Sequence, residues 1–217
     1  MKCKSCGVKF TPTKFLQKFC MANEECTDAA IQFVLENNRR LEEKKKDKEW
    51  KEEKKEMVEK LKNMGDYEKE LQTEINILSR LIDTGNRCIS CGNDGKPQAG
   101  HYHSRGKNTS IRFNLHNLHI QCYRCNVQLS ANITGYNLGL IKTYGKDYQD
   151  YVEYKMPLEF PLLKWTKNDL ILWKAQVMAY KKEVAKLEFP LSAEDRLFWR
   201  NHYNEKIGIY KTNADLH

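Results

Sequence analysis

The sequence contains no run of apolar residues near the ~18 that are needed to cross a lipid bilayer. Its first four residues, Met-Lys-Cys-Lys, lack the apolar stretch of a secretory signal. These two absences disfavour membrane-spanning and secreted proteins, and they predict a cytoplasmic protein without a membrane partner. Hydrophobic residues make up 40% of the 217 and charged residues 30%, which gives room for one medium domain or two small ones.

Disulfide bonds are disfavoured as the role of the cysteines, because a cytoplasm keeps thiols reduced. Thiolates a few residues apart can bind one ion, and a second such pair completes a tetrahedron. We therefore predict two structural Zn²⁺ sites, the first formed by Cys3, Cys6, Cys20 and Cys26, and the second by Cys88, Cys91, Cys122 and Cys125.

The distribution of these motifs predicts an α+β fold in four segments. They are a zinc finger (1–30), a charged helical or coiled-coil segment (31–84), a zinc-stapled core (85–135) and a helical C-terminal region (136–217). In the finger, we expect Phe10, Phe15 and Phe19 to form a small apolar cap. The finger is either a stabilising knob or a DNA contact, and its lysines favour DNA.

The charged segment contains an apolar residue at every seventh position from Trp50 to Leu78. This spacing predicts a seam of coiled-coil periodicity, which Gly65-Asp66 would interrupt. Two interpretations remain open, a solvated single helix laid on the body and a helix that associates with a second copy.

Basic charge is concentrated in the second cysteine module. The formal net charge is +8, and residues 84–156 carry nine Lys or Arg against four Asp or Glu. A basic surface suits a polyanion such as DNA. The residues that we expect to contact DNA phosphates are Arg105, Lys107, Arg112 and Arg124.

Four of the six histidines lie between the two cysteine pairs of the second predicted zinc site. A zinc ion bound by four cysteines needs no histidine as a ligand. His101 is a candidate general base, because its ordinary pKa suits neutral pH. Asn126 and a second imidazole are candidate ligands of a catalytic divalent ion, Mg²⁺ or Mn²⁺. We favour His119 over His103 for that imidazole, since His119 would share a strand face with Asn117. Asn117 would orient the base or tie the loop.

These residues resemble the HNH, or ββα-metal, endonuclease motif. His101 matches its general base, Asn117-Leu118 its central Asn-Leu, and Asn126 its final position, which is usually His. The residue before the base is often Asp or His, a metal ligand, but here it is Gly100. The resemblance implies a ββα core in which a catalytic ion is bound.

The match is closer to the phage NinG/Rap recombination protein family. It rests on Ala-Gly-His-Tyr-x-Ser-Arg-Gly at 99–106, Arg-Phe at 112–113, Asn-x-His-x-Gln-Cys-x-x-Cys-Asn at 117–126 and Leu-Ser-x-Asn at 129–132. The resemblance implies a nuclease that cuts Holliday junctions and D-loops in the host cytoplasm. Cutting two strands favours a homodimer, and host or phage recombination proteins are candidate partners.

Two other functions compete with this prediction. A non-catalytic, zinc-containing DNA-binding protein would recruit recombination partners, and the missing acidic residue at Gly100 supports it. A sequence-specific homing or restriction nuclease would share the same core, but it would need a base-reading module that the sequence does not show.

Overall fold

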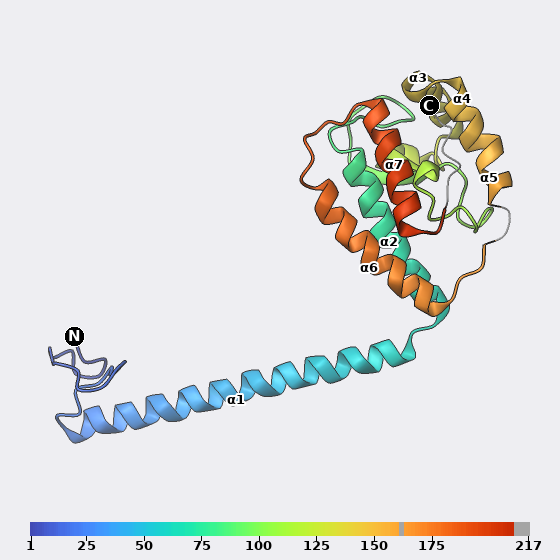
Figure 1. The fold of residues 1–217 in the computed structure, drawn as a ribbon. Helices are drawn as coiled ribbons and strands as arrows, with labels where there is room; N and C mark the ends of the chain where they lie inside the picture. The colour runs from blue at the N-terminus through green and yellow to red at the C-terminus, as the bar shows by residue number, and fades with distance from the viewer. Residues whose placement is uncertain (161–162, 211–217) are drawn as a thin grey trace. The chain divides into compact units, whose positions relative to one another are not determined.

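The computed structural model of the protein describes residues 1–160 and 163–210 and divides into two compact units (Figure 1). The first unit is Met1–Lys62 and the second is Asn63–His217. The described residues form a mixed, helix-rich fold with one two-stranded sheet. Residues 211–217 of the expected C-terminal region lie outside the described residues. None of the helices in the described part of the chain combines the length and the apolar character that a membrane crossing requires.

The first unit joins a short cysteine-containing segment to a long helix. Residues 1–23, here called the finger, contain a bridge between Lys2 and Lys9 and lead into α1 (Glu24–Leu61). The Asn23 side chain accepts a hydrogen bond from the Cys26 N–H and so caps the first turn of α1. Because Cys26 belongs to the first set of cysteines, the finger and the start of α1 are built as one structure.

Helix α1 is exposed along most of its length, and its buried residues are Cys26 and Ala30. Opposite charges lie one turn apart in three ion pairs: Arg39–Glu43, Lys45–Glu49 and Lys48–Glu52. Such pairs each stabilise a helix by about 0.2–0.5 kcal/mol. Local charge pairing therefore supports this helix where no core does.

The predicted helical segment 31–84 is interrupted at Lys62, which is extended. Helix α2 (Met64–Ile82) then begins with a capping box, in which the side chains of Asn63 and Asp66 accept from each other's backbone N–H. The predicted seam is split by this break. Leu71 and Leu78 are buried in the second unit, so that half of the seam packs into a core instead of lining a partner helix.

The sheet of the second unit is an antiparallel hairpin of β1 (Pro97–His101) and β2 (Leu118–Cys122). Gly100 pairs with His119, and His101 pairs with Leu118. The 3₁₀ turn η1 (Leu115–Asn117) precedes β2, and the π-helical turn η2 (Arg124–Gln128) follows it. The ββα motif has an α-helix after its second strand, but here the segment after β2 is a single π-helical turn and the next α-helix is α3 (Ile133–Tyr144).

The two faces of the hairpin pack against different helices. Ala99 and Leu118 join a core formed with α2, α6 (Lys167–Val184) and α7 (Ala193–Ile207), which pack together in Figure 1. The other face lies toward α3 and the short elements α4 (Lys146–Asp150), η3 (Tyr151–Lys155) and α5 (Met156–Glu159). Because side chains alternate along a strand, Gly100 and His119 belong to this second face.

Candidate functional site

Both sets of cysteines have the geometry of a four-thiolate metal site. In each set the four sulfur atoms lie within 4.8 Å of one another. The Sγ–Sγ distances are 3.8 Å for Cys3–Cys26, 3.7 Å for Cys6–Cys20 and 3.8 Å for Cys91–Cys122. A tetrahedral zinc with Zn–S bonds of about 2.3 Å requires sulfur atoms about 3.8 Å apart. Each set could therefore hold one Zn²⁺ ion.

The second set of cysteines connects the two ends of the hairpin. Cys88 and Cys91 lie in a tight turn before β1, closed by a hydrogen bond from the Gly92 N–H to the Cys88 carbonyl. Cys122 ends β2, and Cys125 lies in η2. A bound zinc would thus fix both strands and the segment that carries Asn126.

His101 lies at the end of β1 with its Nε2 atom 3.1 Å from the Arg112 carbonyl oxygen. Burial lowers the pKa of His101 to about 4, while the bond to the carbonyl opposes this shift and the positive charges of Arg105 and Arg112 reinforce it. The ring is therefore neutral at pH 7. Because a carbonyl only accepts, Nε2 carries the proton and Nδ1 carries the free lone pair.

Asn117 is fully buried and ties the loop between the two strands. Its Oδ1 atom accepts from the His103 N–H at 2.7 Å, and its Nδ2 atom donates to the carbonyls of His103 and Ile111 at 3.1 and 3.3 Å. Of the two roles expected for Asn117, these contacts show the one that holds the loop.

His119 is enclosed in the interior of the second unit. Its Nδ1 lies 3.0 Å from the Tyr136 hydroxyl and its Nε2 lies 3.1 Å from the Tyr148 hydroxyl. Burial, with Arg200 and His116 nearby, holds its pKa well below the ordinary value, so the ring is neutral. Its single lone pair faces a hydroxyl, so His119 is not available as the metal ligand expected from the strand pattern.

The remaining candidates differ in accessibility. His103 is half-buried, and its Nε2 lies 2.8 Å from the Val152 carbonyl, which leaves Nδ1 with the lone pair. Asn126 is half-buried, and its side chain makes no hydrogen bond within the described residues. Arg105, Lys107 and Arg124 are exposed. Arg112, also expected to contact DNA, instead forms an ion pair with Glu68 at 2.7 Å.

Gly100 occupies a position where another side chain has taken the space. A Cβ atom added there would lie 1.9 Å from the Oε1 atom of Gln121. Gln121 is itself fully buried and held, because its Nε2 atom donates to the Ser90 hydroxyl at 2.5 Å and to the Ala131 carbonyl at 2.6 Å. The missing acidic residue is thus explained by packing, since no side chain fits beside Gln121.

We expect Gly100→Ala to lower the free energy of unfolding by about 1–3 kcal/mol, the usual cost of an overpacked core. Chemical denaturation measures this effect. In Gly100→Ala/Gln121→Ala the clash is absent, so the double variant should lose less than the sum of the two single variants. Simple additivity of the two losses would contradict the predicted clash.

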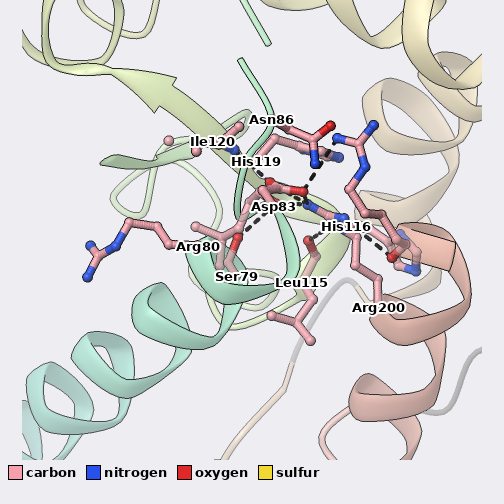
Figure 2. Close-up of polar contacts among 12 residues, drawn as sticks. Ser79, Arg80, Asp83, Asn86, Leu115, His116, His119, Ile120 and Arg200 are labelled. Atoms are coloured by element: carbon pink, nitrogen blue, oxygen red, sulfur yellow. Dashed lines mark hydrogen bonds and ion pairs between the residues drawn. The ribbon is translucent and has the colours of Figure 1, made fainter. Parts of the chain in front are cut away.

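Sequence reasoning missed the buried ion pair that holds the hairpin against its neighbours (Figure 2). Asp83, just after α2, accepts from the Ile120 N–H of β2 at 2.8 Å and from Arg200 of α7 at 2.8 Å. Asp83 and Arg200 are both 0% exposed. No local pattern could have paired them, because 117 residues separate them.

A cleft of this region lies beside the second cysteine set. It has a volume of about 180 Å³ and lies between residues 85–88, 93–95 and 120–122. His101 and Asn126 do not line it. This cleft therefore does not contain the predicted catalytic residues.

Comparison with known proteins identifies relatives across most of the chain. The family model described as "Bacteriophage Lambda NinG protein" matches residues 1–188. Protein ninG of Escherichia phage 933W is 31% identical over 166 residues, which cover 70% of this chain and 79% of that protein. Protein ninG of Salmonella phage P22 is 30% identical over 118 residues, which cover 54% and 56%.

Protein ninG of Escherichia phage lambda is 37% identical over 87 residues, which cover 39% of this chain and 43% of that protein. The chain therefore matches less than half the length of the lambda relative. No solved structure matches the chain. Because the family model covers both cysteine sets, the hairpin and every candidate site residue, the chain belongs to the bacteriophage lambda NinG protein family.

Proposed function

We propose that the protein is a structure-selective DNA endonuclease of the HNH type. It would cut branched recombination intermediates, such as Holliday junctions and D-loops, by metal-assisted phosphodiester hydrolysis. The observation that carries the proposal is the state of His101, a neutral imidazole with a free Nδ1 lone pair at the end of β1. The preference for branched DNA is supported by the family resemblance alone.

In this mechanism His101 Nδ1 removes a proton from the water that attacks the phosphorus atom. The fixed Nε2–H bond to the Arg112 carbonyl keeps the ring oriented during the transfer. Asn117 preserves the loop that continues from His101. Arg105, Lys107 and Arg124 are exposed and would position the DNA backbone without reading its sequence.

A divalent ion, when bound, would stabilise the charge on the scissile phosphate and on the leaving 3′ oxygen. His103 Nδ1 and Asn126 Oδ1 are the protein atoms that would hold it. Apart from the cysteine sets, the described residues contain no group of three or more His, Cys, Asp or Glu that could hold a metal. An ion here would keep several waters and DNA oxygens, as Mg²⁺ does, while the imidazole ligand would favour Mn²⁺.

We expect His101→Ala to slow the cutting of a labelled four-way junction about 10²–10⁴-fold, which is the usual contribution of a general base. Purified full chain is incubated with the junction or with matched linear duplex, in Mg²⁺, in Mn²⁺ or without added divalent metal. Two zinc ions per chain and unchanged junction affinity would show that the variant is folded.

His202→Ala is the matched control, because His202 lies on α7 and belongs to none of the candidate contacts. Full cutting by His101→Ala would contradict the assigned base. Tight junction binding without cutting in any metal would instead support the non-catalytic accessory protein. That second function is favoured by one observation, namely that neither Gly100 nor the enclosed His119 can supply a ligand.

Cutting both strands of a junction requires two active sites, so a homodimer is part of the proposal. Exposed apolar residues on α1, including Leu41, Trp50 and Met57, are the surface available for association. Sedimentation of the full chain with and without junction DNA measures the number of copies.

A further inference from the structure

The finger has an unusual charge composition. Residues 1–23 contain five lysines and no Asp or Glu. A Zn²⁺ ion held by four thiolates carries a formal charge of −2, so residues 1–23 together with this ion carry about +3, and the acidic Glu24, Glu25 and Asp28 follow in α1. This surface suits a polyanion.

The phenylalanine side chains of the finger differ in their packing and exposure. Phe19 packs against Phe33 of α1 with ring centroids 5.5 Å apart, and Lys18 Nζ lies 4.5 Å from the centroid of Phe33. Phe10 is half-buried. Phe15, which the sequence predicted to join them in an apolar cap, is 94% exposed.

Phe15 is presented by an ordered turn. The Gln17 Oε1 atom accepts from the N–H and the hydroxyl of Thr13 at 2.8 and 3.1 Å, and the Gln17 N–H donates to the Lys14 carbonyl at 3.2 Å. Gln17 Nε2 also donates to the Phe19 carbonyl at 2.8 Å, which ties the turn to the packed part of the finger. The turn is thus closed by its own side chains, with Phe15 at its tip.

One residue of this turn has a strained backbone conformation. Leu16 has φ +64, in the left-handed region that branched side chains rarely adopt, and it is also exposed. Strain of this kind is found mainly where the surrounding structure holds a residue for function. A side chain that is already ordered in its binding position loses less entropy when it binds.

We propose that the turn Thr13–Gln17 is a second DNA contact, in which Phe15 stacks on an unpaired base while Lys9 and Lys14 contact flanking phosphates. Aromatic rings bind bases of any sequence, because each base has a π-face. In a continuous duplex those faces are covered by neighbouring bases. The turn therefore selects single-stranded or branched DNA. This inference rests on the proposed function only in that branched DNA is taken to be the substrate.

The test is fluorescence anisotropy with the full chain, carrying His101→Ala and kept in Ca²⁺ so that DNA stays intact. Probes are a single-stranded oligonucleotide, a four-way junction with one unpaired base at the branch, and linear duplex. Phe15→Ala should weaken binding to the first two about 5- to 150-fold, since base–aromatic stacking contributes about 1–3 kcal/mol per base. Binding to linear duplex should change little.

Phe15→Trp should retain the affinity, because Trp restores a stacking surface. Leu158→Ala, at an exposed apolar position on α5, is the matched control and should bind like the parent chain. Lys14→Gln should weaken all three probes and lower the salt dependence of binding by roughly one ion.

Equal loss on all probes, or no loss on any, would overturn the stacking role. Binding of phosphatidylserine vesicles that Phe15→Ala abolishes, with DNA affinity unchanged, would assign the turn to a membrane surface and also overturn the inference. The binding results do not test nuclease activity, because cutting is measured in a separate experiment with His101 intact. Loss of cutting with stacking preserved would reject only the proposed function.

Discussion

Replacing Asp83 with asparagine will lower the free energy of unfolding of the second unit by about 3–5 kcal/mol, the usual cost of breaking a buried ion pair. Asparagine keeps an oxygen that can accept from the Ile120 N–H but removes the charge that faces Arg200. Arg200 would remain 0% exposed, surrounded by the carbonyls of Leu115 and Leu118. Carbonyls alone do not compensate a buried guanidinium.

The size of this loss follows from how many elements Asp83 joins. It lies at the C-terminal end of α2 and accepts a hydrogen bond from the Ile120 N–H at the outer edge of β2. It also forms an ion pair with Arg200 of α7 (Figure 2), and Arg196 Nη1 of the same helix lies 3.6 Å from its carboxylate. Burial opposes the charge of Arg200, but Asp83 and the tyrosines nearby raise its pKa, so it stays protonated. The carboxylate therefore accepts a hydrogen bond at the outer edge of β2 and is the counter-ion of Arg200 in α7.

Guanidinium chloride unfolding, followed by far-ultraviolet circular dichroism, measures the loss. Glu43→Gln breaks the exposed Arg39–Glu43 pair of α1 and should cost no more than about 0.5 kcal/mol. Asp83→Leu/Arg200→Met removes both charges and should be much more stable than Asp83→Asn, because apolar replacements of a buried pair are often tolerated. A loss of under 1 kcal/mol for Asp83→Asn would show that the pair is not a main support.

Local spacing allowed the two four-cysteine groups to be predicted, whereas the enclosure of a side chain could not be predicted from the sequence. Cys88-x-x-Cys91 and Cys122-x-x-Cys125 predict a four-sulfur site because two short spacings suffice to define it. Strand alternation predicted that His119 shares a face with Asn117, and the register pairs His119 with Gly100. It could not show that Tyr136 and Tyr148, from helices 17 and 29 residues away, cover both ring nitrogens.

The break between α1 and α2 illustrates the same limit for the helices. A seven-residue spacing records which face is apolar, and Leu71 and Leu78 do share a buried face. The spacing does not state whether that face meets a second helix or a core, which depends on α6 packing along α2. The helix breaks at Lys62, three residues before the break expected at Gly65. The capping box of Asn63 and Asp66 was the sequence signal that could have placed it.

Acidification from pH 7 to pH 5 will lower the free energy of unfolding of the second unit by about 4 kcal/mol, through His116 and His119 alone. Both rings are buried, and the Tyr148 hydroxyl lies 3.0 Å from His116 Nδ1 and 3.1 Å from His119 Nε2. Burial lowers the pKa of His116 to about 3, with Arg200 adding to the shift, and it also holds the pKa of His119 well below its ordinary value. A proton on either ring would place an imidazolium beside Arg200.

The sign follows from proton uptake. In the unfolded chain both histidines have a pKa of about 6.5, so between pH 6.5 and 4 the unfolded state binds protons that the folded state refuses. The stabilisation is complete above pH 6.5 and is lost as the pH falls toward the folded pKa values. Each histidine contributes up to about 1.4 kcal/mol per pH unit, so the two together approach about 3 kcal/mol per unit.

Urea unfolding at pH 7.5, 6.5, 5.5 and 5.0, with free Zn²⁺ monitored by a chromophoric chelator, separates this effect from loss of metal. His116→Asn removes one titrating ring, so its stability should depend on pH by about one proton less, even though the variant starts less stable. That change of slope distinguishes titration from packing, since a packing defect lowers stability equally at every pH. A parent slope of zero between pH 6.5 and 5.5 would show that water or a rotated side chain accommodates the charged rings, and the enclosure of His119 would then no longer exclude it as a ligand.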